Sequence, residues 1–134
     1  MRNALYLATF FFTLHYGLTL YTNSTYLAQT LGERSVDLLY SLGSLLSILG
    51  LAYIPTLYNR FGQFPTSIGL LGLLIASTYF LALASLPLAI ILFFLLLYVS
   101  NIAVSYNFDL YLEKFSRDEE TGYLRALYLT VINL

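Results

Sequence analysis

The sequence predicts an all-α membrane protein that crosses the bilayer several times as a single domain, residues 1–134. Charged residues are 10% of the chain and apolar residues 59%, whereas a soluble domain is about 25% charged. Three segments carry no Asp, Glu, Lys or Arg: 3–32, 38–59 and 61–108. Each is longer than the roughly 20 residues that a helix needs to cross hydrocarbon. A soluble globular fold is therefore excluded.

The composition also excludes several classes of function. The net charge of −1 argues against a nucleic-acid partner, which would need a basic surface. With no Cys and a single His, the chain offers little for a metal site or an acid–base centre. The carboxylates near 113–120 alternate with Lys and Arg and are typical of a solvated segment. We expect no cofactor, no metal and no enzymatic activity.

The first predicted span covers residues 5–27. A cleaved signal peptide is the alternative, but Ala28 stands between Leu27 and Gln29, which makes a poor cleavage site. The second predicted span covers residues 36–57, between Arg34 and Arg60.

The longest charge-free segment predicts two spans, 65–84 and 87–108, because it is too long for one crossing. Pro65 and Pro87 suit the first turns of these helices. Short connections are expected at 29–35 and 85–86, and a longer polar connection at 113–122.

A partial fifth span is expected at 123–134, since the chain becomes apolar again after Arg125. The nine residues after Arg125 reach only about 14 Å at 1.5 Å per residue, about half of the bilayer core. We therefore expect a fifth span that is cut off, because the natural chain is longer or the gene product incomplete, rather than an amphipathic helix at the membrane interface.

The basic residues predict the orientation in the cell membrane. Cytoplasmic connections carry an excess of Lys and Arg. A cytoplasmic N-terminus leaves only Arg34 outside and places the other basic residues inside, namely Arg2, Arg60, Lys114, Arg117 and Arg125.

Polar residues recur at helical spacing in the first and fourth spans and predict two polar stripes. Function in a membrane protein tends to lie at such residues. In the alternative interpretation, the hydroxyls bond back to their own helix and the amides join neighbouring helices. The stripe residues are Thr9, Thr13, Tyr16, Thr19 or Leu20, and Asn23 in the first span, and Tyr98, Asn101, Ser105 and Asp109 in the fourth. Two such stripes suggest a shared aqueous cavity, whose lining candidates are Thr13, Tyr16, Asn23, Tyr98, Asn101 and Ser105.

Apart from the tyrosines, His15 is the only titratable group well inside a predicted span. It is a candidate proton site or solute contact, with a neutral interhelical hydrogen bond as the alternative. Small residues recur near helical spacing in the second and third spans and predict close helix packing. They are Gly43, Ser47 and Gly50 in the second span, and Gly69 and Gly72 in the third.

Segment 55–64 resembles the signature of the major facilitator superfamily, G-x-L-A-D-R-x-G-R-K, which joins the second and third spans on the cytoplasmic side. Leu57, Arg60 and Gly62 match in register, while Asn59 stands at the Asp position and Pro55 at the first Gly. Gln63 and Phe64 replace the final basic pair. The resemblance implies that this segment takes part in gating, with hydrogen bonds in place of the charge of the Asp.

The resemblance further implies a helical bundle in which the first and fourth helices line a central cavity. The chain would form part of a secondary transporter that moves a small solute by alternating access, with protons as one candidate coupling ion. Its partners would be the lipid bilayer and the remaining transporter helices. Alone, the chain is not expected to transport.

Two alternatives come from other classes. The chain is similar in length to the small multidrug resistance transporters, which dimerise, but it has no carboxylate in its first span. The other alternative is a membrane subunit or scaffold that does not transport. Sequence beyond Leu134 would separate these classes.

Overall fold

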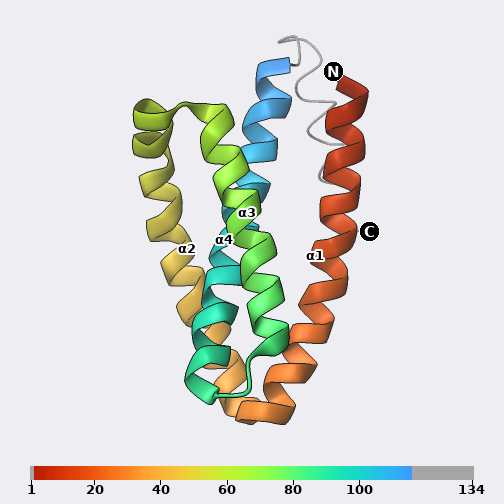
Figure 1. Ribbon diagram of the computed structural model, residues 1–134, viewed down its shortest axis with the longest axis vertical. Coiled ribbons are helices and arrows are strands. Elements are labelled where there is room, and N and C mark those ends of the chain that lie inside the picture. The colour runs from red at the N-terminus through yellow and green to blue at the C-terminus, as the bar shows by residue number, and fades with distance from the viewer. Residues whose placement is uncertain (1, 116–134) are drawn as a thin grey trace. The chain divides into compact units, whose positions relative to one another are not determined.

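The computed structural model describes residues 2–115 and the side chains of 7–111, 113 and 114. This part of the chain is helical, with no strand (Figure 1), which confirms the predicted all-α class there. The predicted fifth span and the acidic residues at 118–120 lie outside the described residues. The four helices are α1 (Arg2–Leu31), α2 (Glu33–Phe61), α3 (Gln63–Leu83) and α4 (Pro87–Phe115).

Single glycines make two of the three connections. Gly32 separates α1 from α2 with φ 86° and ψ 152°, and Gly62 separates α2 from α3 with φ 89° and ψ 158°. Side chains with a Cβ rarely adopt this backbone conformation. The connection expected over 29–35 is wrong, because these residues are helical on both sides of Gly32.

Three helices are long and apolar enough to cross a membrane: Glu33–Phe61, Gln63–Leu83 and Pro87–Tyr111. They coincide with the predicted second, third and fourth spans. α1 is as long as α2 and α4, but its described residues are not apolar enough to place it among the three membrane-spanning candidates. Its Thr, Tyr, His and Asn residues lower its mean hydropathy. The described residues thus suit a protein that crosses the membrane several times.

The described chain divides into two units. The first contains α1 up to Asn23 and α4 from Tyr106, and within it the Phe12 and Phe108 rings lie 5.4 Å apart. The second runs from Ser24 to Ser105 and holds the end of α1, all of α2 and α3, and most of α4.

Close contact between α2 and α4 shapes the core of the second unit. The nearest atom to an ideal Cβ on Gly43 would be Cδ1 of Tyr98, at 2.7 Å, and a Cβ on Gly50 would lie 3.3 Å from Cγ1 of Val99. Only a residue without a side chain leaves the Tyr98 ring this space. The predicted close packing at Gly43 and Gly50 is confirmed, and Ser47 between them is buried.

Aromatic rings extend this contact along α4. Tyr40 of α2 meets Phe94 and Tyr98 edge to face, with centroids 5.1 and 5.5 Å away. On α3, Phe80 stacks on Phe93 at 5.3 Å. α4 therefore packs against both α2 and α3 within this unit.

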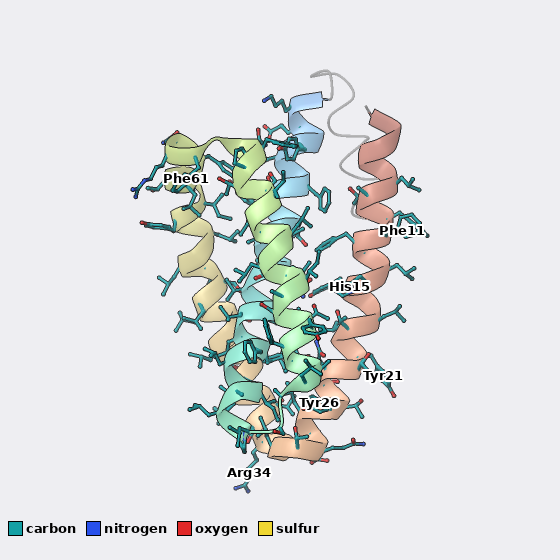
Figure 2. The ribbon with its side chains drawn as sticks, viewed as in Figure 1. Phe11, His15, Tyr21, Tyr26, Arg34 and Phe61 are labelled. Carbon is teal, nitrogen blue, oxygen red and sulfur yellow. The ribbon has the colours of Figure 1, made fainter. Side chains whose placement is uncertain are left out.

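Large apolar side chains cover much of the remaining surface. On α2, Leu38 is 71% exposed and Ile48 is 65% exposed. Figure 2 shows Phe11 and Tyr21 of α1 pointing away from the helix into open space. Such a surface suits contact with lipid or with further helices.

Candidate functional site

The polar stripe of α1 divides into satisfied and unsatisfied hydroxyls. Thr19 donates from Oγ1 to the carbonyl oxygens of His15 at 2.9 Å and Tyr16 at 3.1 Å. The hydroxyl oxygens of Thr9 and Thr13, in contrast, are buried and have no hydrogen-bond partner among the described residues. Figure 2 labels His15 midway along this helix.

The remaining α1 candidates are less enclosed. Tyr16, Asn23 and His15 are half-buried. Tyr16 makes at least one polar or ring contact within the structure. The hypothesis that His15 is a proton site or solute contact stays a prediction.

The polar stripe of α4 contains a second buried group without a partner. Asn101 is only 4% exposed, and its Oδ1 accepts no hydrogen bond within the described chain. One turn earlier, the Tyr98 hydroxyl lies 3.2 Å from Oγ of Ser44. Ser44 donates its own proton to the carbonyl oxygen of Tyr40 at 2.9 Å, so Tyr98 is the donor in this pair. Ser105 is half-buried, and it makes at least one contact within the structure.

Most other hydroxyl groups in the helices agree with the alternative interpretation, in which hydroxyls bond back to their own helix. They donate to a carbonyl oxygen one turn earlier in their own helix, which satisfies them without any neighbour. These residues are Thr22, Thr30, Ser44, Ser47, Ser67, Ser77, Thr78 and Ser100. The unpartnered oxygens of Thr9, Thr13 and Asn101 are therefore exceptions, and all three lie on the predicted stripes.

The two stripes fall mainly in different units. The structure describes each unit by itself, so the cavity shared by the two stripes stays a prediction. Gly69 and Gly72 are exposed on α3 and have no neighbour within 4 Å of an added Cβ. The close packing expected at these two glycines is not found among the described residues.

Segment 55–64, for which the resemblance predicts a part in gating, is helical except at Gly62. Asn59 and Arg60 are exposed in the last turn of α2, where a positive charge favours the helix C-terminus. The Arg60 guanidinium carbon lies 5.3 Å from the centroid of the Phe61 ring, which Figure 2 labels at this end of α2. Pro55 lies inside α2. Only Gly62 interrupts the helical backbone before α3.

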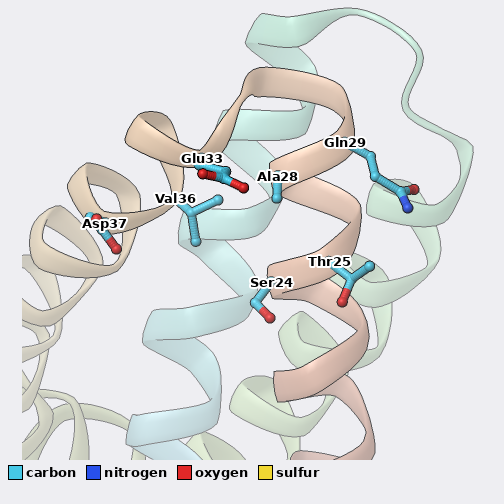
Figure 3. Close-up of a pocket in the computed structure, with 7 residues that line it drawn as sticks. All are labelled: Ser24, Thr25, Ala28, Gln29, Glu33, Val36 and Asp37. Atoms are coloured by element: carbon cyan, nitrogen blue, oxygen red, sulfur yellow. The ribbon is translucent and has the colours of Figure 1, made fainter.

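The structure also contains a hollow beside the turn between α1 and α2, which the sequence does not predict (Figure 3). It has a volume of about 530 Å³ and is lined by Ser24, Thr25 and Gln29 from α1 and by Glu33 and Asp37 from α2, with Ala28 and Val36. The i, i+4 spacing of the two carboxylates was the signal that could have indicated this face. No group of three metal-ligating residues occurs among the described residues.

No family model, curated protein or solved structure matches the chain. The resemblance to the major facilitator superfamily therefore depends on Leu57, Arg60 and Gly62 and on the position of their segment between two apolar helices.

Proposed function

We propose that the chain is part of a secondary active transporter, which moves a small solute across a membrane by alternating access. One observation carries the proposal. The three buried side-chain oxygens without a partner, on Thr9, Thr13 and Asn101, belong to the two stripes that helical spacing marks as polar faces.

A buried polar group without a partner costs about 1–3 kcal/mol. Native proteins contain few such groups, and each calls for an explanation. Water or a hydrophilic solute in a transport path would supply the missing hydrogen bonds. A scaffold would instead gain stability from apolar side chains at these positions.

The segment at 55–64 supports the same proposal. Its resemblance to the major facilitator superfamily assigns Asn59, Arg60 and Gly62 to cytoplasmic gating, with Asn59 acting through hydrogen bonds. In this proposal the chain lies in the cell membrane with its N-terminus in the cytoplasm. The exposed apolar side chains contact lipid and the remaining transporter helices.

Thiol labelling tests the proposal, because residues 1–134 contain no Cys. Single cysteines replace Thr13 and Asn101, and control cysteines replace Leu18 and Leu49, which are 64% and 62% exposed. In liposomes, a membrane-impermeant thiol reagent should label the two stripe positions and spare both controls. Unreactive stripe positions would favour a scaffold whose polar residues only join helices.

A further inference from the structure

The turn between α2 and α3 lies where two apolar helices reach the same end. Both helices are long and apolar enough to cross a membrane, and Gly62 alone separates them (Figure 1). Because the connection is one residue long, the side chains next to it lie close to the limit of the apolar part of both helices. In a membrane this limit falls at the headgroup region.

Two large aromatic rings are exposed at this turn, one on each side of Gly62. Phe61 is 57% exposed and Phe64 is 69% exposed. Exposed apolar side chains at a membrane surface insert into the boundary between headgroups and acyl chains. The two rings therefore suit the level of the bilayer at which the turn lies.

Arg60 adds a positive charge that no carboxylate of its unit neutralises. Its guanidinium carbon lies 5.3 Å from the centroid of the Phe61 ring, in the range of a cation–π contact. The other charged residues of the second unit are Glu33, Arg34 and Asp37, all near the start of α2. The nearest of them in the sequence, Asp37, is about 35 Å from Arg60 along the helix, several Debye lengths at physiological ionic strength.

Charge complementarity identifies the partner that this turn fits. The two rings match the acyl chains of a phospholipid, and the guanidinium matches its phosphate, whose oxygens Arg binds in pairs. A positive charge without a counter-charge favours lipids with a net negative charge over zwitterionic ones. We propose that Arg60, Phe61 and Phe64 anchor the α2–α3 turn on anionic phospholipids. The inference names a lipid partner and does not depend on transport.

Tryptophan fluorescence tests this anchor, because the chain contains no Trp. Phe64→Trp reports on the turn, and Leu86→Trp is the reference, since Leu86 is also 69% exposed but lies beyond the opposite end of α3. Each variant of the full chain is placed in phosphatidylcholine vesicles that contain a small fraction of phosphatidylglycerol. Bromine, which quenches Trp on contact, is carried on the acyl chains of either the phosphatidylglycerol or an equal amount of the phosphatidylcholine.

The quenching should reveal a preference for the anionic lipid at the turn alone. At Phe64→Trp, the association constant should be about fivefold higher for phosphatidylglycerol than for phosphatidylcholine, whereas at Leu86→Trp the two constants should be equal. In the Phe64→Trp background, Arg60→Gln should remove the preference, and Arg60→Lys should retain it because the charge remains. High salt should reduce it. Phe61→Trp is a second reporter at the turn if Phe64→Trp does not fold, since Trp also forms cation–π contacts with Arg.

Three results would overturn the anchor. Equal constants for the two lipids at the turn reporters would show that the turn does not select anionic lipids. A preference that persists in Arg60→Gln would place its cause elsewhere. If neither brominated lipid quenches the turn reporters while both quench Leu86→Trp, protein rather than lipid covers the turn. None of these results changes the labelling of Thr13→Cys and Asn101→Cys, so failure of the anchor and failure of the transport proposal are distinguishable.

Discussion

Replacing Gly43 by Ala tests the contact between α2 and α4. The new Cβ would lie 2.7 Å from Cδ1 of Tyr98, whereas carbon atoms prefer about 3.5–4.0 Å. The ring must move by about 1 Å, and overpacking of this kind costs about 1–3 kcal/mol. The shift also strains the hydrogen bond between Ser44 and Tyr98, which contributes about 0.5–1.5 kcal/mol.

Helix propensity opposes this loss. Ala in place of a helical Gly gains about 0.5–1 kcal/mol, so Gly43→Ala should destabilise the protein by about 2 kcal/mol net. The assay is equilibrium unfolding of the purified chain in mixed detergent micelles, followed by circular dichroism. Gly69→Ala is the matched control, since a Cβ there meets nothing within 4 Å, and it should be neutral or slightly stabilising.

A double-mutant cycle isolates the ring contact. With Tyr98→Ala in the background, the additional Gly43→Ala change should cost nothing, because the atom it strikes is gone. The reasoning is refuted if Gly43→Ala is as stable as Gly69→Ala. It is also refuted if the penalty persists without the Tyr98 ring, since the cost would then come from another contact.

Other substitutions test the connections and the polar stripes in the same unfolding assay. Gly32→Ala should lower the free energy of unfolding by about 1–3 kcal/mol, because φ at this position is 86°. Gly17→Ala should not lower it, because an added Cβ there meets nothing within 4 Å. Equal stabilities of the two variants would contradict backbone strain at Gly32. Asn101→Leu should stabilise by about 1–3 kcal/mol by removing a buried acceptor without a partner; a loss of stability would reveal a partner. Tyr98→Phe and Ser44→Ala should each lower the free energy of unfolding by about 0.5–1.5 kcal/mol, because each removes the hydrogen bond between the two hydroxyls. The double variant should lose no more than either single variant. Additive losses would show that the two hydroxyls have independent roles.

The sequence could predict where helices cross but not where they end. Charged residues mark the limit of the hydrocarbon region, so the sequence predicts a connection at Glu33, Arg34 and Ser35. In the structure these residues form the first turn of α2, because a helix can continue into water once its apolar part has crossed. One glycine with positive φ was enough to reverse the chain.

Glycine spacing predicted packing surfaces without identifying their partners. Gly43 with Ser47 and Gly69 with Gly72 are similar small-residue pairs in the sequence. Only the first pair meets another described helix, since its side of α2 faces Tyr98. Which face meets a neighbour depends on tertiary arrangement, and periodicity within one helix does not contain that information.

The same argument applies to hydroxyls and bears directly on function. Thr13 and Thr19 belong to one predicted stripe, and each has a carbonyl one turn earlier to which it could donate. Thr19 uses these carbonyls, whereas the Thr13 oxygen is buried without a partner. The difference is one of side-chain rotation, which residue identity does not determine. The spacing therefore predicted a polar face, but only the hydrogen-bond inventory could separate hydroxyls that their own helix satisfies from those that require water, a solute or another helix.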